Sequence, residues 1–332
     1  MIRRLYAVPL SFFLGLSVAL PSGAEEIKDC SITHTGIALV HYPDTAAALK
    51  DNKGQSRMAV AVGHIRPRLA NGAVVDWGQG GKIVFVCAGM SNADQACPKW
   101  IQAMKELTGT RNAKGKLVVP PELVFVDVAV GGDADREWAD PNRASWARAQ
   151  ERIEATGASM LQVQVWLHTH AVKQPTVLGS LSPQLVAHVL ANAQAIAPHI
   201  ALHLMYDLGY TGYSRNLDAH GNPIGDGYPV KHPRFSEVAK DGQVLAGIAS
   251  RQAGVPTGTI AEYFRIATDG DWYDDETASP SFPNGLYFRC PLLQDDGIHY
   301  TTSGGADSGA RAVGTNMAER LVEHPILRTM FP

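Results

Sequence analysis

The feature that most constrains the fold is a series of short apolar runs separated by segments of helix length. Continuous apolar runs are typical of strands buried on both faces of a sheet. They occur at residues 82–88, 123–130, 161–167 and 200–206, with a weaker one at 263–266. Helical patterns occur at residues 100–107, 144–156, 183–196, 235–252 and 308–322. This alternation predicts βαβ units, a parallel sheet and an α/β fold.

The number of units favours one domain over two. We expect residues 25–332 to form a three-layer α/β/α, doubly wound domain around a mostly five-stranded parallel sheet. Two irregular segments break the rhythm, at residues 209–233 and 268–285. Long irregular segments in a compact domain are usually functional loops. The formal net charge of −3 offers no basic excess, so we expect no nucleic-acid partner.

The first 24 residues have the pattern of a secretory signal. Arg3 and Arg4 precede an apolar stretch over residues 5–20, and small residues follow at 22–24. The alternative is a membrane anchor, but the stretch is shorter than the roughly 20 residues that span a bilayer. We therefore predict cleavage after Ala24, no stable membrane insertion, and a secreted or periplasmic mature protein.

The chain has four cysteines: Cys30, Cys87, Cys97 and Cys290. In an oxidising compartment an even number favours disulfides. Three pairings are possible and the sequence does not choose among them. A buried free thiol remains the alternative for Cys87, which lies in an apolar strand.

A serine follows the first buried strand, in the sequence Gly89-Met90-Ser91-Asn92. Ligands of open α/β sheets bind at the carboxyl ends of the strands. A serine on a glycine-flanked turn into a helix has an exposed hydroxyl close to helix amides, which can hold an oxyanion. The alternative is a serine or asparagine that only caps the helix.

Two further segments carry chemistry at the same predicted edge of the sheet. Asp296 precedes His299 by three residues, a spacing that lets a carboxylate orient an imidazole. The alternative is a solvated acidic turn. Gly131 and Gly132 follow the second strand, where adjacent glycines let a backbone N–H approach a ligand. The alternative is a simple turn.

Together these motifs resemble the SGNH (GDSL-like) hydrolase superfamily. The stretches GMSN, VAVGGDADREWADP, VQVWLH and DDGIHYTTSGGADSGARAV fall in the expected order over residues 82–321. The resemblance implies Ser91 as nucleophile, His299 as base and Asp296 as its partner, with Gly132 or Gly131 in the oxyanion hole. It implies an esterase that needs no cofactor and acts on a small-molecule or carbohydrate ester, with short acyl chains favoured.

One departure concerns the third strand, after which the superfamily places an asparagine or glutamine as oxyanion donor. This chain has Trp166-Leu167-His168-Thr169-His170 instead. His168, His170 or the Thr169 hydroxyl could donate there. The H-x-H spacing also allows a metal-dependent hydrolase, because both histidines face one side of a strand. A third ligand is not evident from spacing, so we expect no metal.

A non-catalytic carbohydrate-binding relative is a further alternative. Aromatic residues in the two irregular segments could stack on sugar rings, namely Tyr210, Tyr213, Trp272 and Tyr273. Ordinary loop packing explains each of them equally well. The joint presence of Ser91, Asp296 and His299 favours catalysis, because only chemistry requires all three.

Overall fold

The computed structural model describes residues 25–28, 52–170, 183–205, 214–217, 262–265, 290–296, 299–305 and 308–332. Several predictions lie outside the described residues: the signal segment 1–24, the pairing of Cys30 and Cys290, the helix at 235–252, and the four loop aromatics.

A parallel sheet lies at the centre of the molecule. Its strands are β2 (Ile83–Gly89), β5 (Leu123–Asp127), β6 (Val163–Thr169) and β7 (Leu202–Met205). They run in the order β5-β2-β6-β7, and β9 (Glu262–Arg265) pairs in parallel with β7. The predicted α/β class with a parallel sheet is confirmed. The strand order reverses between β2 and β6, and such a switch point is where open α/β sheets bind ligands.

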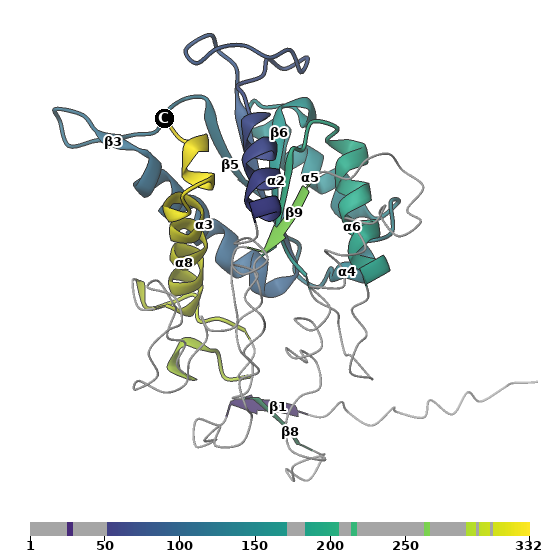
Figure 1. Ribbon diagram of the computed structural model, residues 1–332. Helices are drawn as coiled ribbons and strands as arrows, with labels where there is room; N and C mark the ends of the chain where they lie inside the picture. The colour runs from purple at the N-terminus through teal and green to yellow at the C-terminus, as the bar shows by residue number, and fades with distance from the viewer. Residues whose placement is uncertain are drawn as a thin grey trace, which may run out of the picture.

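Helices cover both faces of the sheet (Figure 1). One face carries α2 (Asn52–Gly63), α3 (Ser91–Thr108) and α8 (Gly309–Glu323). The other carries α4 (Asp135–Trp138), α5 (Ala144–Ala155) and α6 (Pro183–Ile196). This layering is compatible with a three-layer α/β/α fold.

Smaller elements complete the described part. Strand β1 (Glu25–Lys28) pairs antiparallel with β8 (Ser214–Leu217), and β3 (Thr110–Arg111) with β4 (Leu117–Val118). Three short 3₁₀ helices are η1 (Met160–Gln162), η4 (Cys290–Leu292) and η6 (Leu327–Met330).

Each face of the sheet has its own apolar core. Phe85 of β2 and Trp100 of α3 belong to the core under α2, α3 and α8. On the opposite face, Trp138 meets Trp146 edge-on at 4.8 Å between ring centroids, and Trp166 lies beside both. Side chains alternate along each strand, so the position of a residue in the strand decides which of the two cores its side chain faces.

The helix after β2 begins earlier than the sequence predicted. We expected it at residues 100–107 with Pro98 in its first turn, but α3 begins at Ser91 and Pro98 lies inside it. An interior proline costs about 3 kcal/mol. Burial of an apolar face at three- and four-residue spacing offsets that cost; the face comprises Ala93, Ala96, Cys97, Trp100, Ala103 and Met104.

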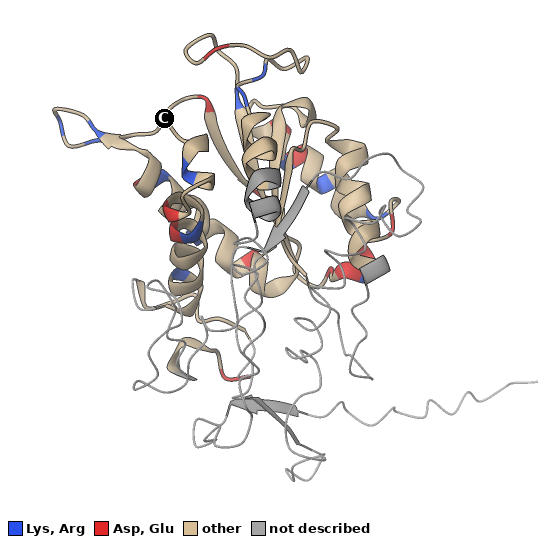
Figure 2. Cartoon of the chain, viewed as in Figure 1, with Lys and Arg blue, Asp and Glu red and all other residues tan. Residues whose placement is uncertain are grey.

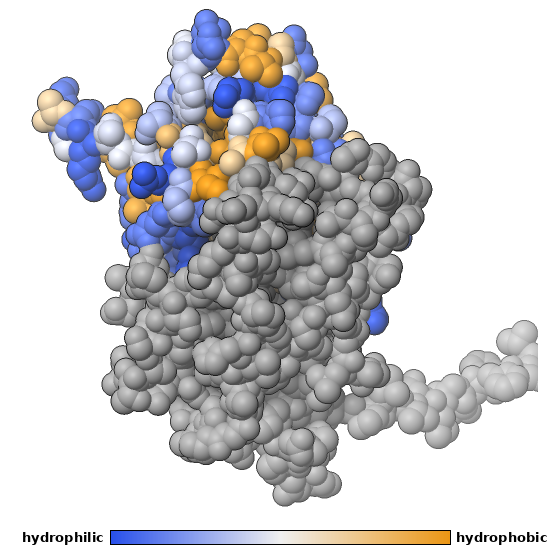
Figure 3. Space-filling view, viewed as in Figure 1, coloured by the Kyte–Doolittle hydropathy of each residue, from blue (hydrophilic) through white to orange (hydrophobic). Residues whose placement is uncertain are grey.

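The described surface mixes charges of both signs. Lysine or arginine and aspartate or glutamate occur together on the α3 and α8 pair (Figure 2). Apolar side chains occur among hydrophilic ones in the space-filling view (Figure 3), and Val74 and Trp77 are among the exposed ones. Within the described ranges, no helix combines the length and apolar character that crossing a bilayer requires.

Candidate active site

Ser91 lies on a turn that only glycine permits. Gly89 has φ +142°, and a Cβ there would lie 2.7 Å from the Cβ of Ala93 and 2.9 Å from the carbonyl oxygen of Thr169. The chain therefore passes from β2 into α3 within two residues. Asp94 N–H donates to the Met90 carbonyl at 2.8 Å, which closes the first turn of the helix. Ser91 is thus held at a helix N-terminus, where amides and the helix dipole favour negative charge.

A disulfide joins the strand before this turn to the helix after it. Cys87 of β2 is bonded to Cys97 of α3, ten residues further on, and both are fully buried. The alternative of a free thiol at Cys87 is therefore wrong. Because the closed loop contains Ser91, the bond fixes the strand that ends before the serine to the helix that starts with it. A disulfide of this kind fits an oxidising compartment.

Asp296 and His299 form a closed local turn. Asp296 Oδ1 accepts the backbone N–H of His299 at 3.0 Å, and Asp296 Oδ2 lies 2.5 Å from His299 Nδ1. The next residue, Tyr300, donates its N–H to Gln95 Oε1 at 2.9 Å. The turn is therefore attached directly to α3, one helical turn beyond Ser91.

The structure brings Ser91 and His299 together although 208 residues separate them. His299 Nε2 lies 2.9 Å from Ser91 Oγ. With Nδ1–H donated to Asp296, Nε2 is free to accept the serine proton, so the three side chains form one hydrogen-bonded chain. His299 and Asp296 are 34% and 31% exposed, which leaves the chain open to a ligand. A serine hydroxyl becomes a nucleophile when such a base is in place.

The predicted glycine turn lies beside the serine turn. Val130 N–H donates to the Gly89 carbonyl at 3.0 Å, which joins the two turns. Asp133 N–H then closes a tight turn onto the Val130 carbonyl, and Gly132 in this turn has φ +83°. The turn's own hydrogen bond uses the N–H of Asp133. Arg143 at 2.7 Å and Ser145 hold the Asp133 carboxylate against the following helix.

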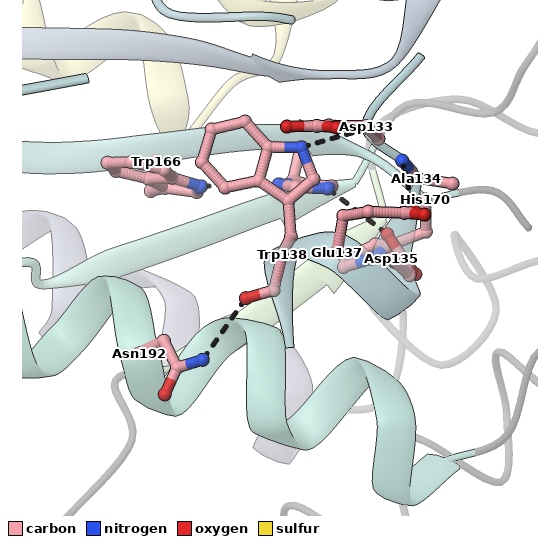
Figure 4. A network of polar contacts seen from close by, with 9 residues as sticks. Asp133, Ala134, Asp135, Glu137, Trp138, Trp166, His170 and Asn192 are labelled. Atoms are coloured by element: carbon pink, nitrogen blue, oxygen red, sulfur yellow. Dashed lines mark hydrogen bonds and ion pairs between the residues drawn. The ribbon is translucent and has the colours of Figure 1, made fainter. Parts of the chain in front are cut away.

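His168 and His170 share a carboxylate that the sequence analysis missed. His168 Nε2 lies 3.2 Å from Asp135 Oδ1, and His170 Nδ1 lies 2.8 Å from Asp135 Oδ2. The two rings stack at 4.4 Å between centroids, and all three residues are buried. Figure 4 shows Asp135 and His170 side by side. One signal was available, because Asp135 follows Gly132 at the same sheet edge.

The protonation of this cluster follows from its contacts. Burial alone would raise the pKa of Asp135, but interaction with His170 and hydrogen bonds from both histidines lower it to about 2. Burial, and then His170, lowers the pKa of His168 to about 4. Asp135 is therefore ionised and His168 neutral near pH 7. Trp166 Nε1 lies 3.4 Å from His168 Nδ1, and an indole N–H only donates. His168 thus accepts at Nδ1 and donates at Nε2, so both of its ring nitrogens are used.

These hydrogen bonds bear on whether the cluster holds a metal. The candidate ligand atoms of Asp135, His168 and His170 lie within 4.8 Å of one another. A metal on His168 Nε2 would move the ring proton to Nδ1, where it would face the indole N–H. Metal-bound histidines normally donate their other N–H to an acceptor. The donor set suits zinc, but the surroundings of His168 suit a hydrogen-bonded carboxylate better.

His203 adds a third buried imidazole to this face of the sheet. It lies on β7 in register with Trp166 of β6. Within the described part of the chain, neither of its ring nitrogens has a hydrogen-bond partner. Burial, followed by interaction with His170 and His168, lowers the pKa of His203 to about 3. His203 is therefore neutral in the folded protein and takes up a proton on unfolding at mildly acidic pH.

We expect His203→Leu to make the protein less sensitive to acid. The pKa of His203 is lower in the folded than in the unfolded protein. The neutral imidazole therefore favours the folded state fully above about pH 6.5, and this stabilisation is lost as the pH falls toward 3. Between pH 7.5 and pH 5, one such histidine lowers the free energy of unfolding by about 2 kcal/mol. Removing an unsatisfied buried imidazole should also leave stability at pH 7.5 unchanged or higher. Urea unfolding of wild type and His203→Leu at both pH values measures the effect.

Exposed His64 offers the matched control. His64→Gln should keep the acid sensitivity of the wild type. Equal loss of stability in wild type and His203→Leu between the two pH values would contradict the assignment of a neutral, buried His203.

Comparisons with known proteins add little to this geometry. No protein-family model matches the chain, and no curated protein does. Among solved structures, a protein from Arabidopsis thaliana has 12% sequence identity and a TM-score of 0.33, over 72% of this chain and 96% of that one. A likeness at this TM-score supports no statement on function.

Proposed function

We propose that the protein is a serine esterase of the SGNH type. The observation that carries the proposal is the hydrogen-bonded chain from Ser91 Oγ through His299 to Asp296. We also propose that residues 25–332 form a single doubly wound domain around five parallel strands. The proposal further includes export by the segment 1–24, which the Cys87–Cys97 disulfide supports.

The reaction follows from the roles of the three side chains. Ser91 Oγ attacks the acyl carbonyl while His299 Nε2 takes its proton. Asp296 accepts the Nδ1–H and stabilises the imidazolium. The tetrahedral oxyanion accepts hydrogen bonds from the N–H groups of Ser91 and Gly132. The intermediate collapses to an acyl-enzyme as His299 returns the proton to the leaving alcohol.

Water completes the cycle. His299 takes a proton from water as the water oxygen attacks the acyl-enzyme. The second intermediate then releases the acid as His299 returns the proton to Ser91 Oγ. No step calls on a cofactor. The resemblance to the SGNH superfamily favours a short acyl group on a small molecule or carbohydrate.

A metal-dependent hydrolase is the second candidate. The grouping of Asp135 with His168 and His170 favours it, because it supplies the third ligand that the spacing alone did not show. In that case zinc would activate water and Ser91 would be dispensable.

A panel of p-nitrophenyl esters from acetate to octanoate, run with and without a chelator, separates the two candidates. We expect turnover of the short esters and no effect of the chelator. A fluorophosphonate probe should label the peptide that contains Ser91. Activity that is lost on chelation and restored by zinc, with no labelling of Ser91, would establish the metal-dependent alternative instead.

A further inference from the structure

We propose that the hydroxyl of Thr169 is the third oxyanion donor, and that Asp135 positions it by binding the histidines on either side. This inference rests on the proposed esterase function and names the residue that replaces the asparagine or glutamine of similar enzymes. Three features of the structure support it: the place of Thr169 in the sheet, the direction of its side chain, and the contacts of its neighbours.

Thr169 lies at the switch point of the sheet. It is the last residue of β6 and pairs with Gly89, the last residue of β2. A Cβ on Gly89 would lie 3.2 Å from the Cβ of Thr169 and 2.7 Å from the Cβ of Ala93. The Thr169 side chain is therefore close to the first turn of α3, where Ser91 lies.

Strand alternation separates Thr169 from both histidines. Val165 and Leu167 belong to the core beneath α3, so Thr169, two residues further along, faces the same side. His168 faces the opposite core, where it meets Trp138 edge-on at 5.7 Å between ring centroids. Because both ring nitrogens of His168 are already hydrogen-bonded, it has no N–H to offer an oxyanion.

The Thr169 hydroxyl is suited to the task. The residue is only 4% exposed. Donors act most strongly where water is excluded, because the local dielectric is low. A hydroxyl can rotate toward the oxyanion as negative charge develops there.

Asp135 connects the two segments that carry the side-chain and backbone donors. It begins α4, three residues after Gly132, and each of its oxygens binds one histidine. The histidines flank Thr169 in sequence. The carboxylate therefore fixes the end of β6 relative to the glycine turn, so that Thr169 and Gly132 are held in one geometry. An asparagine could accept from only one histidine and would present an N–H to the other.

The test replaces the hydroxyl with a methyl group of nearly equal size. We expect Thr169→Val to lower kcat for a short-chain ester about 100-fold, the loss typical for one oxyanion donor. KM should change little, because the donor acts mainly in the transition state. Thr169→Ser keeps the hydroxyl and should retain most of the activity. A Thr169→Val enzyme as fast as wild type, with the fold intact by circular dichroism, would overturn the proposal.

The positioning role of Asp135 is tested with a double-mutant cycle. We expect Asp135→Asn to lower kcat in the wild-type background and to have a much smaller effect in the Thr169→Val background, because the two changes remove one interaction. Equal effects in both backgrounds would contradict the link. A purely structural role would lower thermal stability without this coupling.

The controls separate this proposal from the proposed function. Fluorophosphonate labelling of wild type at Ser91 tests the esterase itself, so an unlabelled, inactive wild type refutes both. A labelled, active wild type with a fully active Thr169→Val variant refutes only the role of Thr169. Zinc bound at one equivalent by wild type and lost in Asp135→Asn would assign the cluster to a metal and refute the positioning role.

Discussion

We expect Ser91→Ala to lower kcat/KM for short-chain esters by at least about 10⁴-fold, the order seen when a triad member is removed. The alanine lacks the hydroxyl that lies 2.9 Å from His299 Nε2. The activity that remains comes from the oxyanion donors and substrate binding. Steady-state kinetics on purified wild type and variant measure the loss.

Stability distinguishes this role from that of a helix cap. The residue at the N-cap of α3 is Met90, and no side chain caps the helix there by a hydrogen bond. Ser91→Ala should therefore leave the thermal midpoint almost unchanged, whereas loss of a cap costs about 1 kcal/mol. Exposed Ser303 provides the matched control, and Ser303→Ala should keep full activity. Near-normal turnover in a folded Ser91→Ala variant would exclude Ser91 as nucleophile.

The strands could be predicted because each carries its own signal. The apolar runs at 82–88 and 161–167 correspond to β2 and β6 within two residues at each end, since full burial on both faces demands continuous apolar sequence. The start of α3 could not be predicted in this way. Pro98 signals a helix start locally, and only burial against the sheet and α8 shows that the helix continues through it.

The close approach of α8 to α3 shows what such packing requires. A Cβ on Gly314 would lie 2.5 Å from the backbone nitrogen of Trp100 and 2.8 Å from the carbonyl oxygen of Ala96. From the sequence alone, Gly314 indicates only a lower helix propensity at this position. The contact that requires it involves residues more than 200 positions earlier.

Some contacts of the candidate site could likewise be predicted from the sequence, and others could not. The spacing of Asp296 and His299 predicts their contact, because a three-residue turn brings the two side chains together. The end of the first apolar run indicates the turn on which Ser91 lies. The bridging role of Asp135 and the pairing of Cys87 with Cys97 depend on which strands are neighbours, and the sequence does not state that order.

Replacing Asp296 should cost less than replacing His299. Loss of the base in His299→Ala should lower kcat by about 10⁶-fold. Asp296→Asn keeps the imidazole but should still lower kcat roughly 10⁴-fold. The reason is the tautomer: an asparagine amide can donate to Nδ1, which leaves a proton on Nε2 facing Ser91. The serine proton then has no acceptor.

The pH dependence provides the second measurement. Wild-type kcat/KM should fall on the acid side, because a protonated His299 cannot take the serine proton. Asp296→Asn should lower kcat/KM over the whole profile, because the carboxylate that orients the His299 ring, 2.5 Å from Nδ1, is gone. Asp295 is an exposed carboxylate next in sequence, and Asp295→Asn serves as the matched control, with wild-type kcat/KM across the pH range. A wild-type profile that stays flat into acid, or an Asp296→Asn enzyme as fast as wild type, would leave His299 without its role as base.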